Sequence, residues 1–429
     1  MGSSLHRFFF PEESDHAFKR RIVILLVIGL LLRLILMPIA FHPDLFWVTY
    51  RAHLLALHGE VNADLLVQPI APLLYGGVIW LFQSVLVPQE LIWPDLWASM
   101  GQEGFQGAFD LRMQIAKTPG IHLSLFLLKL PHLLFDFASA FLLLALLKKK
   151  SSGALLALGF WMLNPIGLYI SYLYGRYDVV AGTFMLLSLY LLTRSRPLSS
   201  LATLALTLLT RLIDLAVAPF FFLSAFLQLA RQRRLLLGSL VTATVALLTL
   251  ITGMLPKLLA LLDRIHGQFL LMARLPILLN DALLIFVIIY GILFFSSLEQ
   301  DLSSPVTVRK YATMALLVMF SLAFFNPQYF FAVLPLLALE IAEQPRLLLY
   351  HLVQIVGYAV YLLNWQTQTT TWIFLPLNPR FFSRLPDPCT LLESYITPRA
   401  FIAIFRSLLS AASLWMAYLI HRSLPKKGA

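Results

Sequence analysis

Long apolar runs, separated by short polar or basic stretches, follow one another along almost the whole chain. A helix needs about 20 apolar residues to cross the roughly 30 Å hydrocarbon layer of a bilayer. The pattern therefore predicts an all-α fold, a polytopic membrane helix bundle of about 12 transmembrane helices with both chain ends in the cytoplasm. The expected crossing helices are Ile22–Phe41, Leu123–Leu147, Ala154–Tyr174, Val179–Leu192, Leu198–Leu209, Leu215–Leu229, Leu235–Leu255, Ala282–Phe295, Tyr311–Phe325, Tyr329–Ile341, Leu347–Leu363 and Phe401–Ile420.

Basic residues set the orientation of this threading, because cytoplasmic loops of membrane proteins carry an excess of Lys and Arg. Every large basic cluster falls on one side of the expected membrane, which we therefore assign to the cytoplasm. The polar breaks at the other helix ends then reach the outer face. The clusters are Lys19–Arg21, Lys148–Lys150, Arg194 with Arg196, Arg231–Arg234, Arg309–Lys310 and Lys426–Lys427.

One apolar segment, Pro72–Pro88, is not counted as a crossing helix. Counting it would place the lysine triplet at 148–150 outside and invert everything that follows. We interpret it as a helix in the outer interface, within a long outer loop from His42 to His122. A second outer loop, Asn364–Arg399, is rich in Thr, Pro and aromatic residues and could cap a cavity.

Composition agrees with a membrane protein, since 59% of residues are hydrophobic and only 12% are charged. The net charge of +11 is explained by basic residues beside the crossing helices, so nucleic-acid binding is not expected. The single cysteine, Cys389, excludes an intramolecular disulfide and a thiolate metal cluster. The first apolar run lacks a small-residue cleavage site and is expected to stay as a crossing helix.

Asp44 is the first candidate for chemistry, because it follows the first expected crossing helix in the segment His42-Pro43-Asp44. A helix over Leu45–Leu57 is expected next, with Trp47 and Arg51 on related positions of one face. A carboxylate at the mouth of an apolar bundle can accept a proton from a substrate hydroxyl. It can equally be an N-cap that binds free backbone N–H groups, and the two roles can coexist.

Three further polar turns fall on the same outer side. Asp178 follows Gly175 and is either an N-cap or a site residue. Arg211 and Asp214 share a turn, where the arginine can hold a phosphate or simply pair with its neighbour. The third turn reads Asn326-Pro327-Gln328-Tyr329. Its two amide side chains and its tyrosine either line a pocket or belong to a plain helix–helix turn.

Three charged residues, Arg33, Lys129 and Asp136, lie inside expected crossing helices. A charge at mid-bilayer costs about 2.5–3.5 kcal/mol, so these side chains should face the bundle interior or a wet cavity. Lys129 and Asp136 are spaced to share one helix face and to pair indirectly. The histidines show no metal-ligand spacing with a carboxylate, so no tightly held zinc is expected.

The order of these motifs resembles the GT-C superfamily of polytopic glycosyltransferases, and most closely its polyprenyl-phosphate-mannose-dependent mannosyltransferases. The resemblance covers roughly residues 22–341. The family's Gly-Gln-x-Asp pattern corresponds to Gly175–Asp178, with Arg176 in place of Gln, and Arg211 stands where Lys is more usual. A second acid beside the first, found in some branches, is missing around Asp44.

The resemblance implies an inverting transfer of a monosaccharide, with mannose the first expectation, from a polyprenyl-phosphate-sugar donor to a lipid or glycan acceptor. Asp44 would be the catalytic base, Arg211 and Arg176 would bind the donor phosphate, and other substrate contacts would come from Asp178, Asn326, Gln328 and Tyr329. No cofactor is expected, and use of a divalent metal stays open. The chain is interpreted as one domain, 1–429, with a catalytic-type module at 22–230, including the outer loop 42–122, and a second helical module at 235–429.

Two other classes of protein fit the same apolar pattern. A multi-span transporter or lipid flippase also has many crossing helices and buried charges, but the polar breaks here gather at one face and not at paired mid-membrane positions. A non-catalytic subunit of another transferase is the third alternative. We expect a prokaryotic plasma membrane rather than the endoplasmic reticulum, with the site on the extracytoplasmic side and any partner subunit unspecified.

Overall fold

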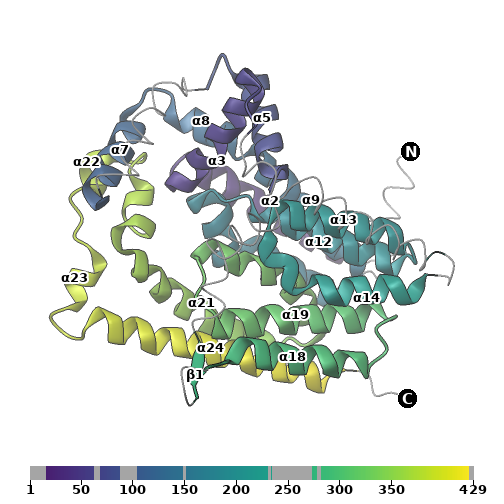
Figure 1. Ribbon diagram of the computed structural model, residues 1–429. Coiled ribbons are helices and arrows are strands. Elements are labelled where there is room, and N and C mark those ends of the chain that lie inside the picture. Colours follow the sequence, from purple (N-terminus) through teal and green to yellow (C-terminus); the bar gives the residue numbers. More distant parts are fainter. Residues whose placement is uncertain are drawn as a thin grey trace. The chain divides into compact units, whose positions relative to one another are not determined.

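The computed structural model describes residues 16–61, 68–86, 104–147, 151–229, 233, 273–277 and 282–424. Helices make up nearly all of the regular structure in this part of the chain, so the predicted all-α class is confirmed (Figure 1). The run Leu235–Leu255 and the basic cluster Lys148–Lys150 lie outside the described residues.

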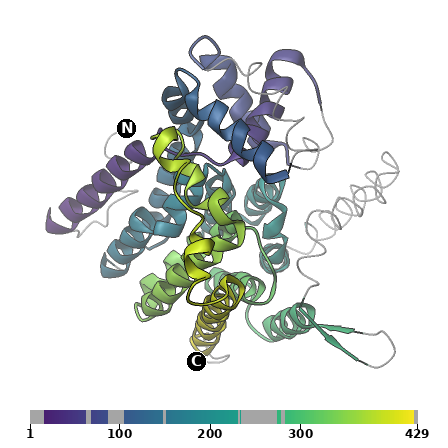
Figure 2. The same ribbon diagram turned by 90° about the vertical axis from the view of Figure 1, so that its left-hand side faces the viewer.

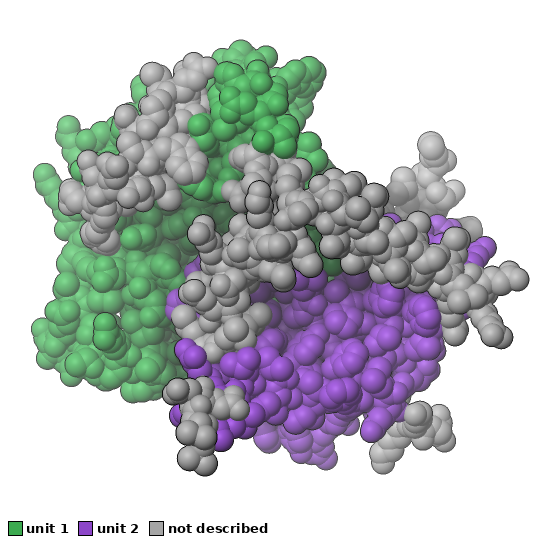
Figure 3. All heavy atoms as spheres, in the orientation of Figure 1, with its two compact units in different colours: residues 1–186, 206–212, 327–409 green, residues 187–205, 213–326, 410–429 purple. Residues whose placement is uncertain are grey.

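The chain forms two compact units that interleave along the sequence (Figure 3). Unit 1 contains residues 1–186, 206–212 and 327–409, and unit 2 contains 187–205, 213–326 and 410–429. Helices α12 (Asp178–Thr193), α13 (Pro197–Thr210) and α24 (Pro398–Arg422) have residues in both units.

Unit 1 begins with a long helix that carries the first apolar run, and its later part returns from residue 327 onward. Its elements before residue 187 are α2 (His16–Leu36), α3 (Pro43–His53), η1 (Leu54–His58), α5 (Ile70–Phe82), α7 (Gly104–Lys117), α8 (Ile121–Leu128), α9 (Leu130–Leu146), α10 (Ser151–Leu163), α11 (Pro165–Leu168) and η3 (Tyr169–Tyr174). The later elements are η6 (Pro327–Val333), α20 (Leu334–Glu343), α21 (Leu347–Tyr361), η7 (Leu362–Thr369), η8 (Trp372–Phe374), α22 (Pro379–Phe382) and α23 (Pro388–Leu392).

Four continuous helical segments among the described residues are long and apolar enough to cross a membrane: Ile121–Leu146, Ser152–Tyr174, Leu347–Thr369 and Pro398–Arg422. Shorter apolar helices of 10–17 residues overlap several other expected crossing helices, including α12, α13 and α14 (Ala218–Gln228). Helix α5, also short and apolar, overlaps the segment Pro72–Pro88 that is expected in the outer interface. The full set of about 12 crossing helices stays a prediction.

Helix α2 shows how the apolar pattern divides between surface and interior. A stripe of its side chains at helical spacing is exposed, and large exposed apolar surfaces mark contact with lipid or protein. The other face buries Ile22, Gly29 and Arg33. The exposed stripe consists of Val23, Ile24, Val27, Ile28, Leu31 and Ile35.

Helix α10 packs against α2, α9 and α20 (Figure 2). The approach to α20 is close: a Cβ atom added at Gly153 would lie 2.8 Å from the carbonyl oxygen of Ala342. Glycine at this position therefore permits the helix–helix contact, since any larger residue would push the two backbones apart.

Replacement of Gly153 by Ala should destabilise the protein relative to Gly159→Ala on the same helix. A Cβ at Gly159 meets no atom within 4 Å, so that change gains only helix propensity, about 1 kcal/mol. At Gly153 the same gain is offset by overpacking of about 1–3 kcal/mol. Unfolding in detergent measures both variants, and equal stabilities would contradict the close packing of α10 on α20.

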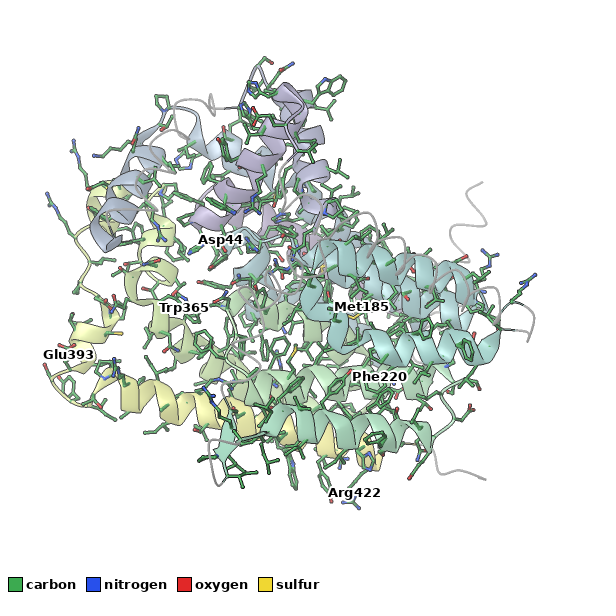
Figure 4. All side chains as sticks on the ribbon, in the orientation of Figure 1. Asp44, Met185, Phe220, Trp365, Glu393 and Arg422 are labelled. Carbon is green, nitrogen blue, oxygen red and sulfur yellow. The ribbon has the colours of Figure 1, made fainter. Side chains whose placement is uncertain are left out.

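Unit 2 contains η4 (Leu212–Ala216), α14 (Ala218–Gln228), α18 (Ile285–Leu298) and α19 (Pro305–Leu322). Phe220 of α14 stacks on Tyr311 of α19, with ring centroids 5.8 Å apart, and is labelled in Figure 4. The sequence interpretation missed a short antiparallel hairpin, β1 (Arg274–Pro276) with β2 (Ala282–Leu284). Residues 282–284 are thus extended, and the helix expected from Ala282 begins at Ile285.

Candidate functional site

The three charged residues within the apolar helices are all buried, as expected, but their partners differ from the interpretation of the sequence. Asp136 accepts hydrogen bonds from Arg33, at 2.6 Å from Nε and 3.3 Å from Nη2. Tyr172 donates a third hydrogen bond to the same carboxylate at 2.7 Å. The indirect pair of Lys129 with Asp136 is not among these contacts, because Lys129 stands at the junction of α8 and α9, where the helical repeat breaks.

The Lys129 ammonium instead donates to three backbone carbonyl oxygens. Met37 and Ala40 lie just beyond α2, at 2.8 and 2.6 Å from Nζ, and Tyr172 belongs to η3, at 2.6 Å. Helix C-terminal ends carry partial negative charge and favour a cation. Lys129 therefore links two segments by hydrogen bonds: the one just before Asp44 and the one just before Gly175.

The segment before α3 is held extended by backbone contacts on both sides. Phe41 N–H donates to the carbonyl of Ile373 at 2.9 Å, and His42 N–H donates to that of Tyr174 at 3.1 Å. His42 is the N-cap of α3, and its Nδ1 accepts from the backbone N–H of Asp44 at 3.3 Å. The N-cap interpretation of Asp44 is therefore wrong, since Pro43 takes the first helical position and histidine supplies the cap.

The Asp44 carboxylate, one position further into the helix, contacts two other side chains. It lies 3.4 Å from His42 Nδ1 and 3.3 Å from Arg176 Nη1. The Asp44 side chain is 33% exposed, whereas that of Arg176 is 9% exposed. A further hydrogen-bond partner could therefore approach the carboxylate of Asp44 (Figure 4).

Arg176 is positioned by the turn that ends the Ser152–Tyr174 segment. Gly175 adopts a left-handed conformation, with φ of +85°, which residues with a Cβ rarely take. The backbone N–H groups of Gly175 and Arg176 both donate to the carbonyl of Ile170, at 3.1 and 2.9 Å. This closed turn directs Arg176 toward Asp44 and starts α12 at Asp178.

Arg211 completes the cluster from the end of α13. Its Nε lies 2.7 Å from the Asp178 carboxylate, and its Nη1 donates to the Tyr177 hydroxyl at 3.3 Å. The guanidinium also lies over the rings of Tyr177 and Tyr329, at 5.1 and 4.9 Å from their centroids. Its Nη2 has no hydrogen-bond partner, although the side chain is only 4% exposed.

Electrostatics keep Asp44 and Arg211 ionised. Burial alone would raise the pKa of Asp44, but His42 and Arg176 hold the pKa of its carboxyl well below the usual range. Burial lowers the pKa of His42, which favours a neutral imidazole. Burial would also lower the pKa of Arg211, but the Asp178 carboxylate raises it, so the guanidinium stays protonated. Asp44 is thus an ionised carboxylate beside fixed positive charge.

The structure thus brings together five of the seven site residues expected from the sequence: Asp44, Arg176, Asp178, Arg211 and Tyr329. Gln328 is buried, and its Oε1 has no hydrogen-bond partner. Asn326 and Asp214 belong to unit 2. The carboxylate that contacts Arg211 is that of Asp178, which lies outside the turn of Arg211 and Asp214. The alternative of a purely local pair between Arg211 and Asp214 did not include this partner.

Several neighbours of the cluster were not singled out from the sequence. Tyr177 contacts Arg211 and donates from its hydroxyl to Gln68 at 3.1 Å. Tyr75, on α5, forms a 2.6 Å hydrogen bond with His132 Nε2, and its ring lies 6.4 Å from that of Tyr177. The apolar setting of Tyr75 gave no signal in the sequence, whereas Tyr177 stands between two charged residues that were both selected.

The arrangement can accept a proton at Asp44 and can stabilise an anion with an arginine nitrogen that lacks a partner. Within the described residues, no three His, Cys, Asp or Glu side chains gather as a metal site, so we assign no metal ligand. Comparison of the chain with protein-family models, curated proteins and solved structures finds no match.

Proposed function

We propose that this protein is an inverting glycosyltransferase that uses a polyprenyl-phosphate sugar as donor. The observation that carries the proposal is the pairing of a partly exposed carboxylate, Asp44, with Arg176 in a cluster that also holds Arg211. Such a cluster offers a proton acceptor and an anion-binding cation in one place. The long apolar helices beside it suit a donor with a lipid tail.

In this proposal Asp44 takes the proton of an acceptor hydroxyl as its oxygen attacks the anomeric carbon. The new carbon–oxygen bond forms on one face of the sugar, while the bond to the phosphate oxygen breaks on the other. Its electron pair leaves with the polyprenyl phosphate, which gains one negative charge. General-base help of this kind contributes about 10²–10⁴ in rate.

Arg211 is suited to the departing phosphate, because Nη2 has no partner in a nearly fully buried side chain. A buried guanidinium N–H without an acceptor costs free energy, and an anion that accepts its hydrogen bond removes this cost. Hydrogen bonds between charged groups are also stronger than those between neutral groups. Tyr177, Tyr329 and Asp178 hold the guanidinium in place. We assign Arg176 to a shared role, at Asp44 and at the phosphate.

The proposal includes the finer features that the resemblance to GT-C enzymes implies. About 12 crossing helices would place the cluster at the outer face of a prokaryotic plasma membrane. Mannose is the first sugar to test, and a membrane lipid or glycan is the acceptor. Gln328 is retained as a substrate contact within this proposal, and the same role for Asn326, in unit 2, stays an expectation from the sequence.

A reconstituted assay tests the reaction class. The purified protein in liposomes would receive polyprenyl-phosphate mannose labelled in the sugar, or the matching glucose donor, together with alkyl glycosides as acceptors. Transfer of label to the acceptor, with release of polyprenyl phosphate, is the expected result. Counterflow of a labelled solute without any transfer would instead support a transporter.

The pH dependence of transfer should change when Arg176 is replaced by Gln. Arg176 lowers the pKa of Asp44, so in the native protein the carboxylate stays ionised as pH falls, and the base is lost only at low pH. Without Arg176 that pKa rises, and the acid limb of the rate profile moves to higher pH. Arg380→Gln, an exposed cation on α22, is the control whose profile should not move. An unmoved limb in Arg176→Gln would argue against Asp44 as the titrating base.

A further inference from the structure

A third arginine, Arg112 on α7, is buried near the cluster but takes no part in it. The side chain donates to the carbonyl of Gln368 at 3.0 Å and to that residue's Oε1 at 3.4 Å. Its guanidinium lies 5.5 Å from the centroid of the Trp372 ring. Trp372 also packs in an apolar cluster that joins α7 to the segment from η8 to α22, and Figure 1 shows these helices side by side.

Arg112 carries a charge that no carboxylate contacts within the described part of the chain. The residue is only 2% exposed, and its Nε has no hydrogen-bond partner. Burial lowers the pKa of Arg112 to about 10, so the group is still protonated at neutral pH. A buried cation without a carboxylate partner is costly, and each unsatisfied buried polar group calls for an explanation.

The position of Arg112 relates it to the candidate base. The groups whose charges act on its pKa are Tyr174, Asp44 and Tyr169, and Arg112 in turn acts on the pKa of His42. His42 stacks on Tyr174, with ring centroids 3.9 Å apart, so these residues form one neighbourhood. Three arginines, Arg112, Arg176 and Arg211, face two carboxyl groups, Asp44 and Asp178, and burial raises the pKa of Asp178. The group therefore holds at least one positive charge in excess.

We infer that Arg112, with Gln368 and Trp372, forms a subsite for an anionic group, a phosphate or carboxylate, carried by the acceptor. The inference rests on the proposed function. Direct displacement puts the attacking and leaving oxygens on opposite faces of the anomeric carbon. Asp44 belongs to the attacking side because it takes the acceptor's proton. The segment that holds Arg112, residues 368–372, continues into Ile373, whose carbonyl accepts a hydrogen bond at 2.9 Å from the N–H of Phe41, three residues before Asp44. Arg112 is thereby joined to the chain segment of the base, whereas Arg211 pairs with Asp178. The indole of Trp372, which is buried and packs on Phe109 with ring centroids 4.9 Å apart, holds the guanidinium of Arg112 in place.

Matched acceptors test the subsite. Octyl glucuronide carries a carboxylate where octyl glucoside carries a hydroxymethyl group, and the two are otherwise alike. Wild-type protein should bind the glucuronide about 10- to 100-fold more tightly, the difference that one charge-assisted contact supplies. Arg112→Gln should raise KM for the glucuronide about 10- to 100-fold more than KM for the glucoside, so that the preference is lost. Arg112→Lys should restore part of it, and Arg380→Gln, an exposed cation on α22, should keep it whole.

Binding and transfer are measured separately, so that each idea can fail alone. Charge-selective binding that depends on Arg112, without any sugar transfer, would keep the subsite and overturn the glycosyltransferase. Transfer with equal affinity for both acceptors would keep the enzyme and overturn the subsite. An equal loss on both acceptors in Arg112→Gln, with binding of both also weakened, would show that Arg112 serves only the fold, which likewise overturns the subsite.

Discussion

Asp44→Asn should lower the rate of sugar transfer by about 10²–10⁴. The amide is as large as the carboxylate but carries no negative charge, so it cannot take the proton of the acceptor hydroxyl. His42 caps α3 through its own Nδ1, so the helix start should survive the change. The variant should therefore retain its unfolding midpoint and its affinity for the donor, and single-turnover kinetics with labelled donor would measure the loss.

The matched control is Asp110→Asn, which removes an exposed carboxylate from α7, in the loop expected between residues 42 and 122. Its transfer rate should stay close to that of the native protein. Near-normal transfer by Asp44→Asn would remove Asp44 from the role of base. A loss that is matched by a lower unfolding midpoint would assign the effect to folding instead.

Asp136→Leu should cost about 3–5 kcal/mol of stability, because it leaves the Arg33 guanidinium buried without its carboxylate. The change also removes the acceptor of the Tyr172 hydroxyl. Replacing both charges, in Arg33→Met with Asp136→Leu, should recover much of the loss, since an apolar pair needs no partner. Reversible unfolding in detergent micelles measures these two variants and the single variant Arg33→Met.

The double-mutant cycle measures the coupling energy between Arg33 and Asp136. A positive coupling energy of about 1–3 kcal/mol between the two positions is expected for side chains in direct contact. If the double variant were as unstable as the sum of the single ones, the 2.6 Å contact between Arg33 and Asp136 would not be an energetic pair. Transfer activity of the double variant would then show whether Tyr172 and the Lys129 contacts still position the cluster.

Local patterns predicted the elements that carry the site better than they predicted the contacts within it. The helix expected over Leu45–Leu57 is found as α3 and η1, and Arg51 lies over Trp47 on its surface, as their spacing indicated. The N-cap alternative for Asp44 depended on aspartate being a frequent N-cap. His42, two residues before Asp44, caps the helix instead, and the residue types alone do not indicate this choice.

Long-range partners were beyond the reach of the sequence. Arg33 and Asp136 are 103 residues apart, and periodicity within one helix says nothing of a contact at that separation. The spacing of Lys129 and Asp136 suggested a shared face, but the helix breaks at Lys129, which turns its side chain toward carbonyls of other segments. The sequence did not single out Arg112, because the groups that contact its side chain come from residues 368–372, which are far from it along the chain.

The anomeric configuration of the first transferred sugar tests the central claim most directly. Product made by the purified protein from a polyprenyl-phosphate sugar of known configuration would be examined by NMR, together with the amount of polyprenyl phosphate released. Direct attack assisted by Asp44 predicts a product of opposite configuration, with one polyprenyl phosphate released for each sugar transferred. A product of unchanged configuration would require a second displacement through an enzyme-bound sugar, and would contradict Asp44 as a simple base.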